Sequence, residues 1–195
     1  MSLLNNMICS ETHRPVLLGI AHESICSGLQ NGKALDPVAR DWPAELLETR
    51  ASFVTLKQDD QLRGCIGTLE AHTRLVNSVA DNAYAAAFRD PRFPVLTSPE
   101  LGGLTIDISV LGDLQAVEYE SETGLLAVMQ AGRDGWVIQE HGARGTFLPS
   151  VWDSLPDARR FLGQLKLKAG LDADYWSDSI EVWRYSTESF SALAS

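Results

Sequence analysis

A cysteine lies between two glycines in the segment LRGCIGT, residues 62–68, next to an arginine. In an extended strand, Arg63 and Cys65 share one face because side chains alternate with a period of two. A neighbouring guanidinium raises the thiolate fraction of a cysteine, and the thiolate is the nucleophilic form. The flanking Gly64 and Gly67 remove bulk and let a ligand approach the backbone. The segment therefore predicts either a nucleophilic thiol or an anion site built from Arg63 and strand amides.

A structural interpretation of the same segment stays open. Free cysteines are among the most buried residue types in proteins. The alanine-rich segment NAYAAAF, residues 82–88, follows in a predicted helix, and close packing of that helix on the strand would itself require glycine. The sequence alone does not decide between a working thiol and a packed one.

Two further segments carry side chains with catalytic potential. Asp90 and Arg92 end the helix that follows the cysteine strand, and rigid loops with charged residues are common places for functional groups. His141 lies at the tip of a predicted hairpin, where it could act as a general base near neutral pH. The alternatives are that Asp90 and Arg92 only pair with each other and that His141 only faces solvent. The candidate catalytic residues are Cys65, Asp90 and His141.

The histidines and cysteines do not form a metal-binding pattern. One spacing places His22 and Cys26 on the same helix face, and two ligands without a third are weak evidence. The chain has neither a phosphate-binding loop nor a dinucleotide-binding glycine motif, so the cofactor stays unknown. Three cysteines without a C-x-x-C motif favour free thiols in a reducing compartment.

Composition narrows the classes of partner. The chain has 195 residues, a net charge of −10 and a pI of about 4.8. This balance argues against binding to nucleic acid or to anionic membranes, both of which need a basic face. No stretch approaches the roughly 20 apolar residues of a membrane helix, and no targeting segment is visible. We expect a cytoplasmic protein.

The helices and strands that hold these residues are predicted from the hydrophobic periodicity of the sequence. We expect helices over 15–29, 43–48, 73–89 and 122–130, and a helix that Ser154 opens, with Asp157 in its capping box, and Gly170 closes. We expect strands in two hairpins, 51–71 and 135–149, in the segment from 104, and in a single final strand over 178–190. Helices alternating with hairpins predict an α+β fold, mainly antiparallel sheet flanked by helices. The predicted boundaries are a flexible N-terminus over 1–14, one domain over 15–190 and a C-terminal tail over 191–195.

Several of these segments resemble a known family. The strings LRGCIGTLEA, NAYAAAFRDPRFPVLTSPEL, LTIDISVL, GRDGWVI, GTFLPSVW and FLGQLKLKAGL occur in the order and spacing of the AMMECR family, whose bacterial and archaeal members are called AmmeMemoRadiSam system protein A. The resemblance covers about residues 15–190. It implies an α+β fold with a larger and a smaller subdomain around a cleft lined by the LRGCIGT strand. It also implies a genomic association with a Memo-like protein and a radical SAM protein, without a settled reaction.

The resemblance extends the candidate site. The candidate binding residues are Arg63, Gly64, Ile66, Gly67, Thr68 and Arg92, and a small anionic ligand is one candidate partner. Family members often have a cysteine where this chain has Lys166, so a dithiol mechanism is not expected here. Two functions stay open: a cytoplasmic enzyme or enzyme subunit with a functional thiol that acts with the Memo-like and radical SAM proteins, or a non-catalytic binding or adaptor module that uses the same cleft.

Overall fold

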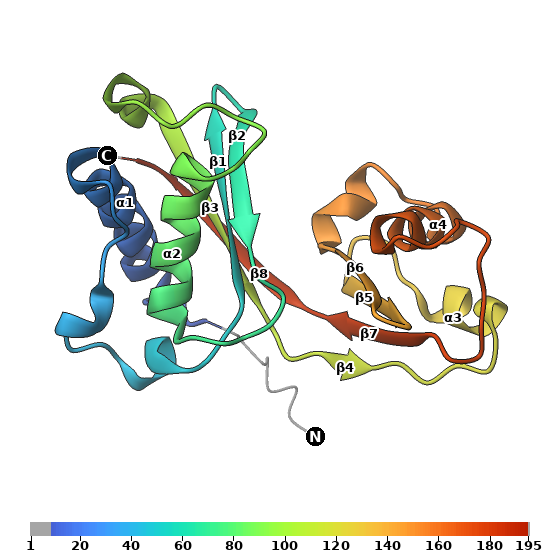
Figure 1. The fold of residues 1–195 in the computed structure, drawn as a ribbon. Coiled ribbons are helices and arrows are strands. Elements are labelled where there is room, and N and C mark those ends of the chain that lie inside the picture. The colour runs from blue at the N-terminus through green and yellow to red at the C-terminus, as the bar shows by residue number, and fades with distance from the viewer. Residues whose placement is uncertain (1–8, 195) are drawn as a thin grey trace. The chain divides into compact units, whose positions relative to one another are not determined.

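The computed structural model describes residues 9–194 and divides the chain into two compact units. Unit 1 contains the described residues up to Leu111 and those from Glu188 onward, and unit 2 is Gly112–Thr187. Each unit combines helices with a four-stranded sheet whose described pairings are antiparallel (Figure 1). The predicted α+β class is therefore confirmed.

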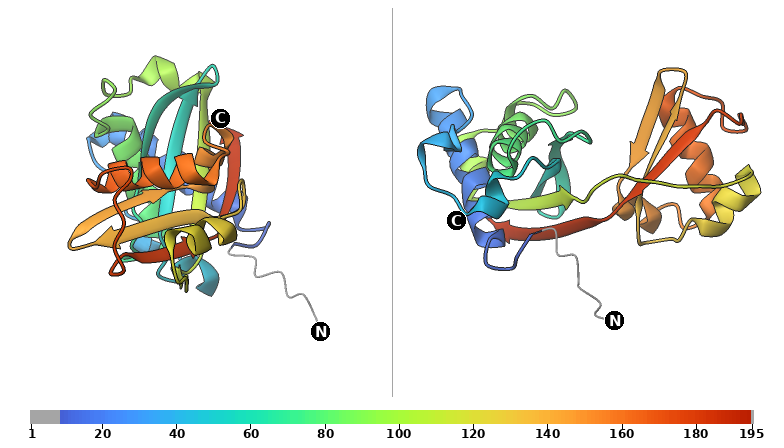
Figure 2. Two further views of the ribbon diagram at one scale, coloured as in Figure 1. Left: turned by 90° about the vertical axis from the view of Figure 1, so that its right-hand side faces the viewer. Right: turned by 90° about the horizontal axis from the view of Figure 1, so that it is seen from below.

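Unit 1 places two long helices on one face of its sheet (Figure 2). The helices are α1 (Arg14–Asn31) and α2 (Leu75–Phe88). The strands follow the order β2-β1-β3-β8, so β2 and β8 lie at the edges. Their bounds are β1 (Ser52–Gln58), β2 (Gln61–Gly67), β3 (Leu104–Leu111) and β8 (Thr187–Leu193). Short 3-10 helices cover Pro37–Ala39, Ala44–Leu47 and Ser98–Gly103.

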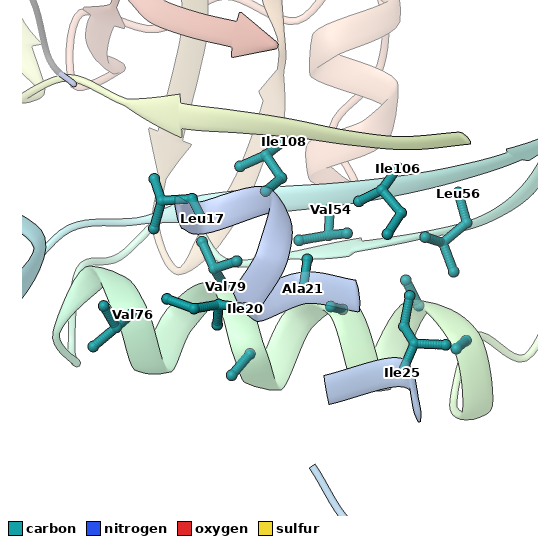
Figure 3. Close-up of a cluster of buried hydrophobic side chains, with 14 of the residues drawn as sticks. Leu17, Ile20, Ala21, Ile25, Val54, Leu56, Val76, Val79, Ile106 and Ile108 are labelled. Carbon is teal, nitrogen blue, oxygen red and sulfur yellow. The ribbon is translucent and has the colours of Figure 1, made fainter. Parts of the chain in front are cut away.

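The core of unit 1 lies between this sheet and the two helices (Figure 3). Alternate residues of β1 and β3 point into it because a strand turns successive side chains to opposite faces. The buried side chains from the sheet include Val54, Leu56, Ile106 and Ile108, and those from the helices include Leu17, Ile20, Ile25, Val76 and Val79. The other residues of β1 and β3 therefore form a second face of the sheet, which is more polar and only partly buried.

Helix α2 approaches the cysteine strand very closely. A Cβ atom at Gly64 would lie 2.1 Å from the backbone oxygen of Ala86, which is far inside van der Waals contact. Gly64 is buried, and Ala83, Ala86 and Ala87 of α2 are buried as well. The structural interpretation offered for the glycine, that the alanine-rich helix requires it, is confirmed at this position.

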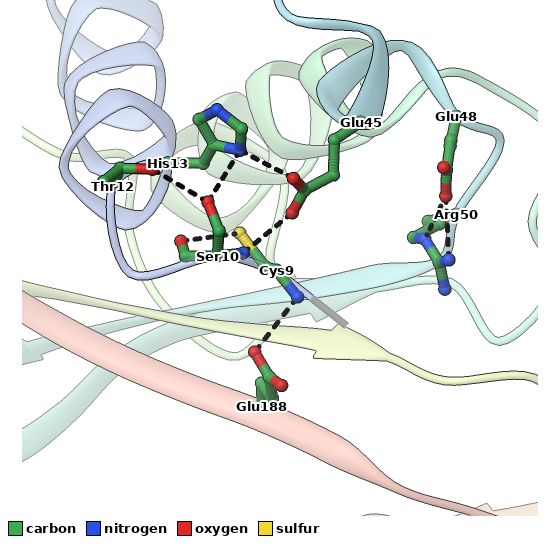
Figure 4. Close-up of polar contacts among 8 residues, drawn as sticks. All are labelled: Cys9, Ser10, Thr12, His13, Glu45, Glu48, Arg50 and Glu188. Atoms are coloured by element: carbon green, nitrogen blue, oxygen red, sulfur yellow. Dashed lines mark hydrogen bonds and ion pairs between the residues drawn. The ribbon is translucent and has the colours of Figure 1, made fainter. Parts of the chain in front are cut away.

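Polar contacts hold residues 9–13 against the rest of unit 1 (Figure 4). The Cys9 N–H donates to Glu188 at 3.1 Å, and the Ser10 N–H donates to Glu45 at 2.7 Å. His13 also contacts Glu45, with 3.0 Å between Nδ1 and Oε2. The expected flexible N-terminus over 1–14 therefore differs from the structure in its last part, where side-chain carboxylates bind the backbone. Residues 1–8 lie outside the described residues.

Unit 2 has the sheet order β4-β7-β5-β6. Its strands are β4 (Gln115–Ala116), β5 (Gly135–Glu140), β6 (Ala143–Phe147) and β7 (Glu181–Tyr185). Its helices are α3 (Glu122–Val128) and α4 (Ala158–Ala169), with a 3-10 helix at Pro149–Asp153. Buried aromatic side chains fill its core, and the rings of Trp152 and Phe161 stack with their centroids 3.8 Å apart.

The structure corrects two local predictions. Helix α4 begins at Ala158, not after Ser154, because Asp157 is its N-cap and accepts the Arg160 N–H, whereas Ser154 donates to the Val151 carbonyl. The predicted single strand over 178–190 is two strands, β7 in one sheet and β8 in the other. Ser186 lies between them, where its carbonyl accepts the Gly112 N–H.

The C-terminal segment also differs from the expected tail over 191–195. Strand β8 continues to Leu193, and the buried Ala194 donates its N–H to the Leu104 carbonyl at 2.7 Å. Backbone pairing thus extends the sheet through these residues. Among the described residues, no helix combines the length and hydropathy needed to cross a membrane.

The close approach of α2 to β2 gives a stability prediction. Gly64→Ala forces a Cβ against the Ala86 carbonyl, and overpacking of this kind costs about 1–3 kcal/mol of unfolding free energy. Urea denaturation followed by circular dichroism measures the change. Gly102→Ala is the control, because a Cβ there would meet nothing within 4 Å, and its effect should stay within about 0.5 kcal/mol. Equal effects of the two substitutions would contradict the packing argument.

Candidate functional site

Cys65 lies on the more polar face of the unit 1 sheet, the face opposite the core side chains Val54 and Leu56. This face, which also carries Thr55 and Asp107, is called the open face. Cys65 pairs with Thr55 across β1, and Thr55 belongs to the residues of β1 that face away from the buried core. The Thr55 hydroxyl donates to the Cys65 sulfur, with 3.2 Å between Oγ1 and Sγ. Cys65 is only partly buried as a residue, whereas Cys9 is buried. Solvent therefore reaches this residue, and the open face is where a reactant would meet it.

The backbone of Cys65 is held at the free edge of β2 by a charged loop. Its N–H donates to Asp90 Oδ2 at 2.9 Å, and its carbonyl accepts from Arg92 Nη2 at 3.2 Å. Asp90 and Arg92 thereby provide the acceptor and the donor that a neighbouring strand would provide. These contacts bring the segment Asp90–Arg92 against the cysteine strand.

Asp90 is a buried carboxylate with several donors. Arg92 donates to it from Nε at 2.9 Å, from Nη2 at 2.7 Å and from its backbone N–H at 3.1 Å. These bonds, with the Cys65 N–H, hold the pKa of Asp90 well below its usual range, although burial acts in the opposite direction. Asp90 is 4% exposed and stays ionised near neutral pH. Such a group holds its neighbours in place, and it is poorly suited to proton transfer.

Arg92 is the guanidinium that contacts the cysteine. Asp90 raises the pKa of Arg92 most, and the neighbouring Cys65 adds to that rise. The side chain of Arg92 is 54% exposed, so it also meets solvent beside the thiol. The alternation of side chains predicted this role for Arg63, two residues away along the strand.

Arg63 is occupied by a different partner. The register of β2 against β1 shifts between Leu56 and Lys57, and this irregularity breaks the simple alternation near Arg63. The Arg63 Nε donates to Glu100 Oε1 at 2.7 Å, and the buried Arg63 Nη1 has no hydrogen-bond partner among the described residues. An anion site built from Arg63 and the strand amides is therefore already filled by the carboxylate of Glu100.

The other candidate binding residues of the LRGCIGT string, Gly64, Ile66, Gly67 and Thr68, have packing or backbone contacts in the structure. Gly64 faces α2, and a Cβ at Gly67 would lie 2.3 Å from the ring of Phe53. Ile66 packs against the core of unit 1. Thr68 is exposed and donates its N–H to a carbonyl of β1. A binding role for these four residues stays a prediction.

Three polar side chains on the open face were not singled out from the sequence. Thr55 lies between Cys65 on one neighbouring strand and Asp107 on the other. Asp107 is paired with Lys57, with 3.2 Å between Oδ2 and Nζ. The alternation in ASFVTLK and LTIDISV places these residues opposite the buried ones. Combining that alternation with the strand order would have found them.

His141 belongs to unit 2. It lies in the tight turn between β5 and β6 with a φ of 46°, followed by Gly142 with a φ of 89°. Its side chain is 80% exposed, and its Nε2 lies 3.3 Å from Oε1 of the buried Glu140. The described contacts of His141 are thus within its own hairpin, and its catalytic role stays a prediction.

The described residues contain no group of three or more His, Cys, Asp or Glu side chains arranged to hold a metal ion. The pair singled out by its spacing, His22 and Cys26, forms a contact of 3.6 Å between Nε2 and Sγ on helix α1. These two residues therefore act as neighbours on one helix face.

Comparison with known proteins covers both units. A model of the AMMECR1 family matches residues 18–190. The chain belongs to the AMMECR1 family. It is 34% identical over 187 residues to a protein of Thermofilum pendens, covering 90% of this chain and 87% of that one. It is also 34% identical over 186 residues to a protein of Methanopyrus kandleri, covering 89% and 86%.

The fold of the AMMECR1 family is supported by a solved structure as well. The crystal structure of an uncharacterized protein from Pyrococcus horikoshii superposes with a TM-score of 0.86 at 30% sequence identity, covering 94% of this chain and 93% of that chain. The resemblance stated from the sequence strings is thus confirmed. Membership of the AMMECR1 family establishes the fold, and the chemistry has to be argued from the site.

The Arg63–Glu100 pair gives a prediction for acid stability. Arg63, assisted by Thr97, lowers the pKa of Glu100 from 4.5 to about 2. Because the folded-state pKa lies below the unfolded value, the ionised carboxylate stabilises the fold above pH 4.5, and this contribution is lost as the pH falls toward 2. Urea denaturation over that range should show a smaller loss of stability in Glu100→Gln than in the unsubstituted protein. The exposed Glu120→Gln is the control, and an equally flattened profile there would contradict the assignment.

Proposed function

We propose that the protein is an enzyme or enzyme subunit that uses the Cys65 thiol as a nucleophile. The observation that carries this proposal is the position of Cys65, a partly buried residue on the open face, with the Thr55 hydroxyl on its sulfur and the Arg92 guanidinium on its backbone carbonyl. The hydroxyl donor and the cation are placed to bind an anionic group of a reactant that approaches the sulfur. Asp90 is a positioning residue here, because it binds the Cys65 backbone and orients Arg92.

The other two cysteines are poorer nucleophiles. Burial, with the nearby Glu45 and Glu188, raises the pKa of Cys9 to about 11. Burial also raises the pKa of Cys26. A thiol with a raised pKa holds less thiolate at neutral pH, so nucleophilic chemistry at these positions is disfavoured. The proposal is thereby specific to Cys65.

The surroundings of the thiol favour a polar substrate. The Lys57–Asp107 pair lies on the same sheet face, and the Ser109 hydroxyl there contacts Ser189 at 2.8 Å. The exposed part of Arg92 supplies a cation for an anionic group of the substrate. The proposed partners are the Memo-like and radical SAM proteins that the family resemblance implies, and the proposed compartment is the cytoplasm. The residue that transfers protons stays unassigned.

A second candidate function is a binding or adaptor module. It is favoured by the contacts of Asp90, whose oxygens are all engaged by donors, and by the packing that explains Gly64 and Gly67. In this case the open face would recognise a partner protein or a small anionic ligand without a covalent step. The two candidates differ in whether the sulfur itself is needed.

Selective alkylation tests the thiol. Iodoacetamide at pH 7.5, with quantification of the modified peptides by mass spectrometry, should label Cys65 first and Cys9 last. Arg92→Gln should slow labelling of Cys65 about tenfold, which corresponds to about 1.4 kcal/mol of lost stabilisation. Arg89→Gln is the matched control, because Arg89 stacks on Tyr84 instead, and it should leave the rate unchanged. Labelling of Cys65 no faster than that of Cys9 would rule out the nucleophile.

Cys65→Ser separates the two candidate functions. If the thiol is the nucleophile, the variant should keep its fold and its binding to the Memo-like protein in a pull-down, and it should fail to complement a deletion strain. If the protein is an adaptor, the variant should both bind and complement. Complementation by Cys65→Ser at the level of the unsubstituted gene would therefore overturn the enzyme proposal.

A further inference from the structure

A pocket lies within unit 2, among α3, α4 and the loop that follows α4. It has a volume of about 380 Å³, within the range of small-ligand sites. It is lined by Glu122, Arg159, Arg160, Gly163, Gln164, Ala173 and Asp174. All seven residues fall inside Gly112–Thr187, so the pocket belongs to one compact unit.

The glycine in the wall leaves room in the pocket. Among the described residues, a Cβ at Gly163 would meet Ala173 alone, at 3.7 Å, which is an ordinary contact. Gly163 is therefore unlike Gly64, whose lack of a side chain is demanded by a neighbouring backbone. Here the missing side chain widens the space between α4 and the loop at Ala173.

A buried lysine holds Glu122, one of the acidic residues that line the pocket. Lys166 is fully buried, and its Nζ donates to Glu122 Oε1 at 2.6 Å. The same Nζ lies 5.4 Å from the centre of the Trp176 ring. The charge of Glu122 is thus balanced inside the protein, and no described residue is bonded to its other oxygen, which is left as an acceptor for a ligand.

The basic side of the pocket is formed by the guanidinium groups of Arg159 and Arg160. Within residues 9–194, neither Arg159 nor Arg160 has a hydrogen bond or ion pair from its side chain, whereas Arg63 and Arg92 are both paired with carboxylates. The acidic lining residues are Glu122, which is paired with the buried Lys166, and Asp174. Among the charged lining residues together with Lys166, the basic side chains exceed the acidic ones by one. Guanidinium pairs bind carboxylates and phosphates through planar, two-pronged hydrogen bonds.

We propose that this pocket binds a small organic anion of the phosphomonoester or carboxylate class that also carries hydroxyl groups. Arg159 and Arg160 take the anionic group, and Glu122, Gln164 and Asp174 take the hydroxyl groups. The site is separate from Cys65 in its residues and does not depend on the thiol chemistry proposed above. It gives the FLGQLKLKAGL string, which contains Gly163 and Lys166, a role in ligand binding.

Titration of the full-length, ¹⁵N-labelled protein in low-salt buffer tests the proposal. The probes are glycerol 3-phosphate, inorganic phosphate, glycerate and glycerol. Glycerol 3-phosphate should bind saturably, with shift changes confined to residues around 122, 159–164 and 173–174, and glycerol should not bind. Inorganic phosphate should bind more weakly, because it lacks the carbon-bound hydroxyl groups. Saturable binding of glycerate at the same residues would support the proposal for carboxylates, and no saturable binding by any of the three anions would overturn the proposal.

Variants separate this pocket from general charge effects. The double substitution Arg159→Gln, Arg160→Gln should weaken binding of glycerol 3-phosphate at least tenfold, and Gly163→Leu should block it by filling the space. Arg133→Gln with Arg184→Gln is the control, since it makes the same change of net charge elsewhere in unit 2. Thermal unfolding should show that all variants fold. Affinity equal to that of the unsubstituted protein in the Arg159→Gln, Arg160→Gln variant would reject the site.

Discussion

The buried carboxylate of Asp90 is the constraint on which the candidate site depends. An ionised group that is 4% exposed destabilises a fold unless donors surround it. Its donors come from Arg92 and from the backbone of Cys65, so satisfying one charge fixes the loop after α2 to the edge of β2. The same contacts cover the edge at the point where β2 would otherwise expose unpaired backbone groups. The thiol thus sits on a strand whose position is set by electrostatics as well as by the sheet.

Two packing requirements explain the unusual composition of the cysteine strand. Gly64 lets α2 approach on the covered face, and Gly67 accommodates the ring of Phe53. Neither glycine has to be explained by a ligand. The chemical character of the site comes instead from side chains on neighbouring elements, namely Thr55 of β1 and Arg92 of the loop. A functional thiol and tight local packing are therefore compatible in one short segment.

Local patterns in the sequence predicted most elements of the fold, because helix and strand periodicity and the glycine C-cap at Gly170 depend on nearby residues. The contact of the Asp90–Arg92 loop with Cys65 was found only in the structure. The alternation of side chains assigned the cation beside the thiol to Arg63. That assignment failed because the register of β2 shifts opposite Leu56 and because Arg63 binds Glu100, which lies 37 positions away in the sequence. Neither feature can be seen from neighbouring residues. The break at Ser186 was missed for a similar reason, since both sides of it look like strand and only the tertiary structure assigns them to different sheets.

Strand β8 places a late segment of the chain in the sheet that carries Cys65. Unit 2 is contiguous in sequence, whereas unit 1 needs residues from both sides of it. On the ribosome, which delivers the chain from its N-terminus, Gly112–Thr187 can close its core before the sheet of unit 1 receives its last strand. Long-range strand pairing of this kind also slows folding. The candidate site is therefore completed late in synthesis, and a truncated chain that lacks β8 carries the whole LRGCIGT segment on an unfinished sheet.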